Sequence, residues 1–186
     1  MLDEDFCFLS DPVNLGRAID LVELLNSFEQ EARIRFTKKL SEAMTATQAR
    51  LASRWTLESN LESKDNPEFF LRPRKGYLVP VFLVSVIGWD NDDPTQLAPY
   101  WGVWCDEDAK PKKKTWDLAK VAISALLSSS VQHEEDSELL FEYVPEFPRG
   151  TKASLLEIIG VNGDRLAERM AEKAAEIAEA LETAFG

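Results

Sequence analysis

The sequence predicts an α+β protein, in which a small antiparallel sheet of about three to four strands packs against helices. Two observations predict this class. Apolar residues recur every three or four positions in both terminal thirds of the chain, which is typical of amphipathic helices. The middle third contains short segments rich in Val and aromatic residues, which is typical of strands. Helices and strands in separate runs favour segregated layers, with a long N-terminal helix and a C-terminal helical hairpin.

The chain of 186 residues, 45% of them hydrophobic, is long enough for one domain with a sizeable core. We therefore expect a single domain over residues 1–186. Its predicted parts are a loosely held arm (1–10), a helical N-terminal segment (11–57), a sheet with a crossover helix (68–147) and a C-terminal helical hairpin (151–186).

The N-terminal segment carries the clearest helix signals. Asp11 followed by Pro12 predicts a helix start, because Asp is a good N-cap and Pro suits the first helical position. Glutamates precede arginines by four residues at 29–33 and 31–35, the favourable orientation for ion pairs. A second helical piece is expected through Trp55. The apolar stripe of the long helix comprises Leu15, Ile19, Val22, Leu25, Phe28, Ala32, Phe36 and Leu40.

The middle of the chain predicts three strands. The polar stretch 58–68 ends in Asn-Pro and is expected to be a loop. Strands are predicted within 76–89, where Pro80 implies an edge position or a bulge, then at 100–105 and within 138–147. The second strand is expected to run antiparallel to the first.

Helices fill the rest of the chain. Thr115 is expected to cap a helix over 116–132, with His133 at its end. A short helix over 152–160 and a last helix capped by Asp164 complete the hairpin. The apolar stripe of the last helix comprises Leu166, Met170, Ala174, Ile177, Leu181 and Phe185.

The charge excludes some classes of partner. The chain has 33 acidic and 21 basic residues, a net charge of −12, and residues 116–186 contribute 14 acidic and 6 basic residues, or −8. This balance disfavours nucleic acid and anionic membranes as direct partners, and it favours a protein with a basic surface. The densest acidic run comprises Glu134, Glu135, Asp136 and Glu138.

Few residues suit catalysis or metal binding. His133 is the only histidine, which excludes multi-histidine metal sites, and Cys7 and Cys105 do not make a disulfide framework.

The first residues are acidic where a signal peptide is basic, and the longest apolar run, Tyr77–Trp89, is shorter than a membrane helix. We expect a cytoplasmic protein without cofactors.

Two tryptophans are candidates for partner binding. Trp101 and Trp104 are three residues apart, so on a regular strand their side chains point to opposite faces of the sheet. Tryptophan is enriched in interface hot spots. One of the two is therefore expected to face away from the helices.

An acidic and basic pattern follows the same strand. Asp93 precedes Pro94, and Asp108-Ala109-Lys110 has the acid-x-lysine form that resembles the metal-dependent PD-(D/E)xK nucleases. This resemblance, over about 20 residues, implies carboxylates at Asp93 and Asp108 that hold a metal ion, and Lys110 beside the attacking water. The triplet follows the strand in a highly charged stretch, however, which indicates a loop.

We therefore expect a non-enzymatic, acidic protein-protein interaction module. The form we favour is an inhibitor or nucleic-acid mimic, of the anti-defence, antitoxin or immunity type, that occupies a basic surface of its partner. The expected contacts are the two tryptophans and the acidic run. One alternative is a divergent metal-dependent nuclease, and another is a structural subunit that oligomerises through its N-terminal or C-terminal helix.

Overall fold

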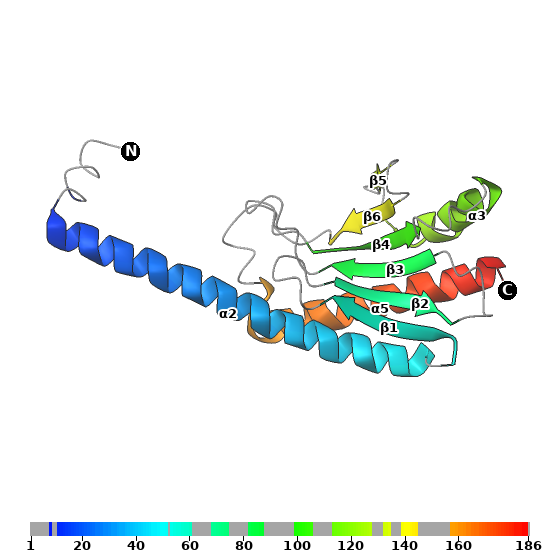
Figure 1. The fold of residues 1–186 in the computed structure, drawn as a ribbon, viewed down its shortest axis with the longest axis horizontal. Helices are drawn as coiled ribbons and strands as arrows, with labels where there is room; N and C mark the ends of the chain where they lie inside the picture. Colours follow the sequence, from blue (N-terminus) through cyan, green and yellow to red (C-terminus); the bar gives the residue numbers. More distant parts are fainter. Residues whose placement is uncertain are drawn as a thin grey trace. The chain divides into compact units, whose positions relative to one another are not determined.

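The structure is a computed structural model of the chain (Figure 1). It describes residues 8, 11–51, 53–60, 68–74, 82–87, 99–105, 113–127, 132–134, 139–144 and 157–185. The chain divides into two compact units, Met1–Arg35 and Phe36–Gly186. Most of the predicted arm, the region of Pro80 and the predicted helix start at residues 152–156 lie outside the described residues.

Helix α2 (Pro12–Leu51) begins where the sequence predicts. The Asp11 carboxylate accepts hydrogen bonds from the backbone N–H groups of Val13 (2.9 Å) and Asn14 (3.2 Å), so it caps the helix. The predicted ion pairs Glu29–Arg33 and Glu31–Arg35 both form. The helix ends at Leu51 rather than at residue 57, so the expected helical segment is too long.

The apolar positions of α2 differ in burial along its length. In the unit Phe36–Gly186, α2 contributes to the core through four fully buried side chains: Phe36, Leu40, Met44 and Leu51. In the unit Met1–Arg35, Ala32 is buried, but the predicted stripe positions Leu15, Ile19, Val22, Leu25 and Phe28 are exposed. The periodicity correctly predicted a helix with an apolar face, but burial of that face stops short of its N-terminal part.

Within the described ranges, six strands form one sheet in the order β1-β2-β3-β4-β6-β5. Every pairing is antiparallel. The bounds are β1 (Trp55–Asn60), β2 (Glu68–Pro73), β3 (Phe82–Ile87), β4 (Tyr100–Cys105), β5 (Gln132–Glu134) and β6 (Leu139–Tyr143). The mixed helix-and-strand class is confirmed, whereas the number of strands differs from the expected three to four.

Strand β1 lies where a helix end and the start of a loop were expected, whereas β2 lies within the range 68–147 expected for the sheet but before its first predicted strand. The first four residues of β1 alternate apolar and polar, and β2 has three consecutive apolar residues, Phe69–Leu71, so each strand has only a short and weak signal in the sequence. Trp55, Phe69 and Leu71 are fully buried on one side of this hairpin, while Glu58 and Arg72 on its other side form an ion pair at 2.9 Å. Burial of these three side chains against the helices therefore stabilises both strands, although most residues of β1 are polar.

The connection from β4 to β5 contains helix α3 (Lys113–Ser124). Thr115 lies inside this helix rather than at its cap, and the helix ends well before residue 132. His133 is consequently not at a helix end, because it lies in β5 and pairs with Leu140 of β6. The buried face of α3 comprises Trp116, Ala119 and Ile123.

Helix α5 (Gly160–Phe185) begins before the predicted cap, Asp164. Gly160 has a φ angle of 59°, a left-handed conformation that glycine tolerates well. Asp164 instead forms an ion pair with Lys39 of α2 at 2.6 Å. The buried face of α5 is rich in alanine and comprises Gly163, Ala167, Met170, Ala171, Ala174, Ala175, Ile177, Ala178 and Leu181.

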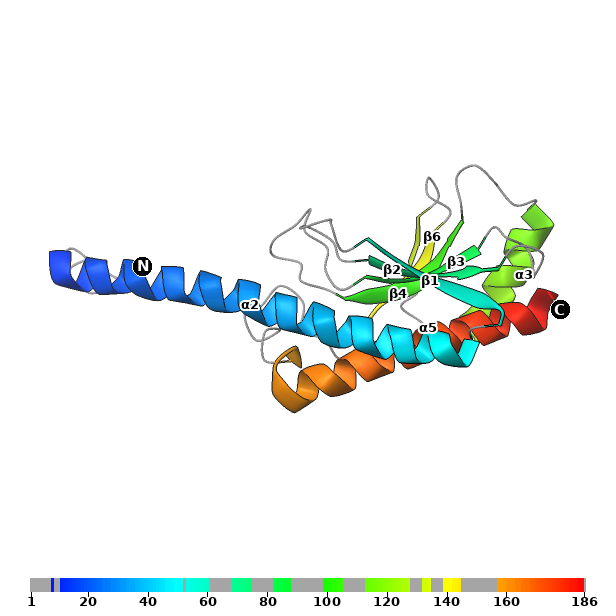
Figure 2. The ribbon, with the colours of Figure 1, turned by 60° about the horizontal axis from the view of Figure 1, so that its bottom comes forward.

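The core of the unit Phe36–Gly186 lies between the sheet and its helices. Helix α5 crosses one face of the sheet against β3 and β4, beside the C-terminal part of α2 (Figure 2). Helix α3 packs on α5. The sheet side chains that point to these helices are fully or nearly fully buried: Trp55, Phe69, Leu71, Trp101, Val103 and Leu140. The opposite face of the sheet therefore carries the alternate residues of each strand.

Candidate binding face of the sheet

The sheet face opposite α5 carries a cluster of aromatic rings. Tyr100 of β4 and Phe141 of β6 have ring centroids 5.2 Å apart, and Tyr143 lies 5.9 Å from Tyr100 and 5.4 Å from Phe141. The interplanar angles of 54° to 82° are tilted or edge-to-face, the geometry that aromatic pairs favour. All three residues are half-buried. They form an ordered aromatic surface rather than a set of isolated rings.

Strand register places further residues on this side. One row of paired residues crosses β2, β3, β4 and β6 through Phe70, Ser85, Gly102 and Phe141. Paired residues share a face of a sheet. Trp104 lies on the same side of β4 as Tyr100, since the two are four residues apart. Phe70 and Trp104 are also half-buried. We call this surface the aromatic face: Phe70, Tyr100, Trp104, Phe141 and Tyr143.

Gly102 makes the close approach of β4 and β6 possible. A Cβ atom at this position would lie 2.5 Å from the carbonyl oxygen of Leu140 and 2.8 Å from the Cβ of Phe141. Both distances are far below van der Waals contact, so only glycine fits between Tyr100 and Trp104 in this arrangement. The missing side chain lets β6 bring Phe141 beside the ring of Tyr100.

A carboxyl group lies in the same row of the sheet as two of the rings. Glu68 of β2 pairs with Ile87, which pairs with Tyr100, which in turn pairs with Tyr143. Burial raises the pKa of Glu68 above its ordinary value of 4.5, because desolvation disfavours the charged form. The ionised carboxylate of Glu68 would therefore be stabilised by a cation brought to this face.

The acidic run of the sequence adjoins the aromatic strands in topology. Glu134 ends the edge strand β5 and pairs with Leu139 at the start of β6. Glu135, Asp136 and Glu138 connect these two strands and lie outside the described residues. The chain thus leads from four acidic positions directly into the strand that carries Phe141 and Tyr143.

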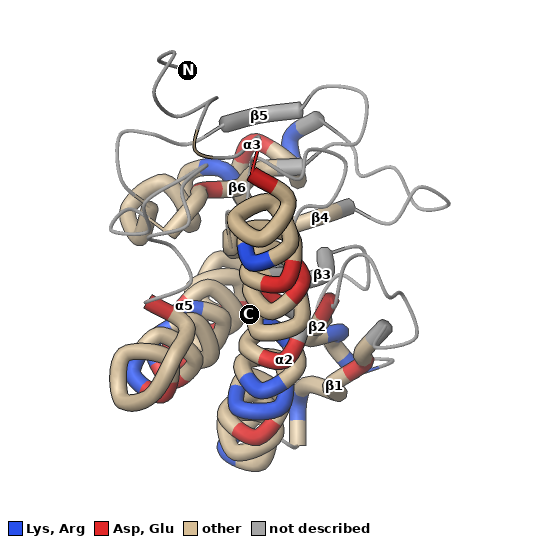
Figure 3. The backbone as a smooth tube through the Cα atoms, turned by 90° about the vertical axis from the view of Figure 1, so that its left-hand side faces the viewer, with Lys and Arg blue, Asp and Glu red and all other residues tan. Residues whose placement is uncertain are grey.

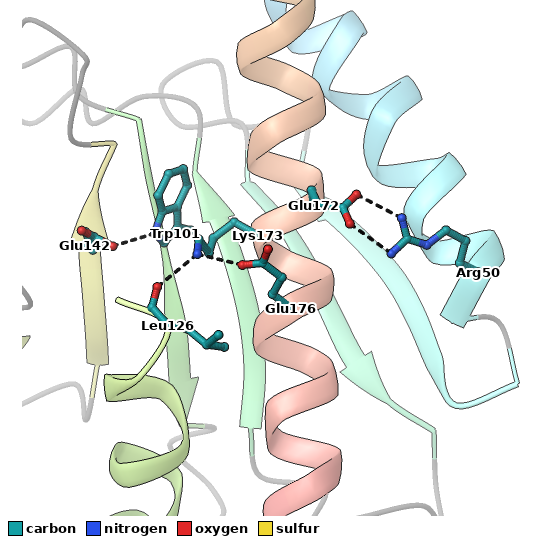
Figure 4. Close-up of polar contacts among 7 residues, drawn as sticks. All are labelled: Arg50, Trp101, Leu126, Glu142, Glu172, Lys173 and Glu176. Carbon is teal, nitrogen blue, oxygen red and sulfur yellow. Dashed lines mark hydrogen bonds and ion pairs between the residues drawn. The ribbon is translucent and has the colours of Figure 1, made fainter. Parts of the chain in front are cut away.

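The two candidate tryptophans do point to opposite sides of the sheet. Trp101 is 2% exposed, and its Nε1 donates to Glu142 Oε2 at 3.1 Å (Figure 4). Arg169 of α5 lies 5.6 Å from its ring. This burial under α5 removes Trp101 from the accessible surface and leaves Trp104 on the aromatic face. Which of the two tryptophans lies under α5 depends on where α5 packs, which the strand sequence alone does not specify.

Sequence reasoning missed the other aromatic residues of this face. Tyr100 and Trp104 are an even number of residues apart, as are Phe141 and Tyr143, so each pair is expected on one side of its strand. That pattern gives each strand an aromatic side but does not show that β4 pairs with β6. The pairing, which spans α3 and β5, brings the two aromatic sides together.

A second concave surface lies between α2 and α5, with a volume of about 490 Å³. Acidic and basic positions are interspersed along both helices (Figure 3). Lys39 and Asp164, which both line this surface, form an ion pair at 2.6 Å. Arg50 and Glu172, which also line it, form another at 3.0 Å (Figure 4). The hydrogen bonds that Arg50 donates to the Glu172 carboxylate, and the negative charge of that carboxylate, raise the pKa of Arg50. Because these charges already satisfy one another, the groove offers less to a ligand than the aromatic face.

The residues of the nuclease alternative, Asp93, Asp108 and Lys110, lie outside the described part of the chain. Within the described ranges, no three His, Cys, Asp or Glu side chains are grouped as metal ligands. Nor does any helix in those ranges have the length and apolar character to cross a membrane.

Comparison of the chain with protein-family models, with curated proteins and with solved structures finds no match.

Proposed function

We propose that the protein is a non-enzymatic binding module that holds a basic segment of a partner protein against the aromatic face of its sheet. The observation that carries this proposal is the packed cluster of Tyr100, Phe141 and Tyr143 on the sheet face opposite α5. Aromatic rings supply large contact areas at low entropic cost, and tyrosine and tryptophan dominate interface hot spots.

Charge supports a cationic partner. Arginine and lysine are attracted to aromatic ring faces by about 0.5–2 kcal/mol per contact. Glu68 lies in the row of the two tyrosines, and Glu134 lies in the strand beside Phe141. A net charge of −12 would also steer a basic segment towards the protein at long range. An inhibitor or nucleic-acid mimic that occupies the basic groove of its target is a specific form of this proposal.

The test separates the aromatic contribution from general charge attraction. Binding of a fluorescent peptide rich in arginine and tyrosine is measured by anisotropy for wild type and for Tyr143→Ala, which has the same net charge. We expect the variant to bind at least several-fold more weakly, because one hot-spot truncation costs about 1–2 kcal/mol or more. Val121→Ala, on the exposed face of α3, is the matched control and should bind like wild type.

Salt and charge reversal test the electrostatic part. Replacing Glu134, Glu135 and Asp136 with lysine should weaken binding at low salt and flatten its salt dependence. Equal affinities for wild type and Tyr143→Ala would refute the aromatic face as the docking site. Binding indifferent to salt and to the triple charge reversal would refute the mimic form of the proposal.

A further inference from the structure

The unit Met1–Arg35 exposes an apolar stripe on α2. Its six central members are Leu15, Ile19, Leu21, Val22, Leu25 and Phe28, each exposed by 39% to 56%. They recur at helical spacing, so they lie on one broad side of the helix. Val13, Leu24 and Ile34 are exposed too, but they lie outside this stripe, on the far side of the helix. Scattered exposed leucines are normal in proteins, but a continuous apolar stripe marks an interaction site.

The size of the stripe suits a protein interface. Six half-exposed residues offer on the order of 500 Å² per chain, so two copies would bury roughly 1,000 Å², the lower bound of a specific interface.

The charge of the helix that carries the stripe excludes two other classes of partner. Residues 11–35 contain five acidic and three basic residues, a net charge of −2, and the opposite side of the helix carries Asp20, Glu23 and Ser27. Helices that lie on membranes need a cationic polar side, and nucleic acid needs clustered Lys and Arg.

We infer that the stripe pairs with the same stripe of a second copy, in antiparallel orientation. Residues 11–23 contain Asp11, Asp20 and Glu23 against Arg17, a net charge of −2. Residues 24–35 end in Arg33 and Arg35, which balance two glutamates. Antiparallel pairing places the acidic half of one helix beside the arginine end of the other, whereas parallel pairing places the two acidic halves together. The interface is self-complementary, as a two-fold dimer requires.

The first experiment measures molar mass by light scattering after size exclusion, at about 1 and 100 μM. The wild type is expected to be dimeric at 100 μM. Leu21→Glu, and as a second variant Val22→Glu, should be monomeric because a carboxylate would be buried in the apolar seam. Ser27→Glu adds the same charge on the opposite side of the helix and should remain dimeric. Tryptophan fluorescence checks folding, since all five tryptophans lie in residues 36–186.

A distance between spin labels on the two helices tests whether the dimer is parallel or antiparallel. With both native cysteines replaced, a spin label at Asn14→Cys lies near its counterpart in a parallel dimer. In an antiparallel dimer centred in the stripe the two labels are roughly 20–30 Å apart, at 1.5 Å per residue. A monomeric wild type at 100 μM, or dimers in both glutamate variants, would overturn the proposal. So would binding of the wild type, but not Leu21→Glu, to phosphatidylserine vesicles without dimerisation. A short label distance would overturn the antiparallel orientation.

Discussion

Replacing Gly102 with alanine tests whether β4 and β6 approach as closely as the structure shows. The new Cβ would lie 2.5 Å from the Leu140 carbonyl oxygen and 2.8 Å from the Phe141 Cβ. The first of these atoms is backbone, so no side-chain rotation relieves the clash and the two strands must separate. Overpacking of this kind costs about 1–3 kcal/mol, and the rigid neighbour places Gly102→Ala in the upper part of that range.

The assay is urea unfolding followed by tryptophan fluorescence. Its signal reports the unit Phe36–Gly186, because every tryptophan lies there. With a denaturant slope of about 1–3 kcal/mol per M, a loss of about 2–3 kcal/mol lowers the midpoint by roughly 0.7–3 M. Separation of the strands should also move Phe141 from Tyr100, now 5.2 Å away, and weaken peptide binding to the aromatic face.

Gly16→Ala, in the unit Met1–Arg35, is a control for the change of glycine to alanine itself, since no atom lies within 4 Å of its added Cβ and the residue is in a helix. Alanine is favoured over glycine inside helices by about 0.5–1 kcal/mol, so this variant should not lower the midpoint. If Gly102→Ala unfolds at the same urea concentration as the wild type, β4 and β6 do not approach as described, and the explanation of the aromatic cluster fails with it.

Two further predictions concern carboxylates at the sheet. Burial raises the pKa of Glu68, so its ionisation opposes folding: stability is lost as pH rises above the ordinary value of 4.5 through the raised value. Glu68→Gln should therefore be more stable than wild type at pH 7, with the difference shrinking towards pH 4; urea midpoints across this range check it, and a constant difference would contradict it. Glu182 accepts a hydrogen bond from Trp55 Nε1 at 2.6 Å and pairs with Arg54. Glu182→Ala leaves the buried indole donor without its acceptor and should cost about 1–3 kcal/mol in the same assay, whereas the exposed Glu179→Ala should cost little.

The sequence predicted best where one short pattern determines one element. Strand β4 has the predicted bounds, and Asp11 caps α2 as expected. It predicted least where a segment forms a strand or a helix because residues far away in the sequence bury it. The hairpin β1–β2 is a strand pair because Trp55, Phe69 and Leu71 are buried, although much of its sequence is polar. His133 was assigned to a helix end because the polar serines after α3 do not mark where the helix stops.

The stripe of α2 and the tryptophans of β4 show the same division. Periodicity correctly gave α2 an apolar face, but not which part of that face the chain itself covers: Phe36 and Leu40 are fully buried, whereas Leu15 is 45% exposed. Alternation correctly put Trp101 and Trp104 on opposite sides, but not which side α5 would occupy. A local pattern specifies that a side is apolar, while long-range packing specifies what lies against it.

The two proposed surfaces lie in different units, and together they predict avidity. If stripes pair two copies, each dimer presents two aromatic faces, and a target with several basic segments can be held at both. Linked sites raise apparent affinity by about 10²–10⁴ without any new contact. Leu21→Glu should therefore dissociate much faster than wild type from a surface densely coated with the basic peptide, yet bind the same free peptide with unchanged affinity. Tyr143→Ala should weaken both. Equal dissociation of wild type and Leu21→Glu from the dense surface would show that the faces of a dimer do not act together.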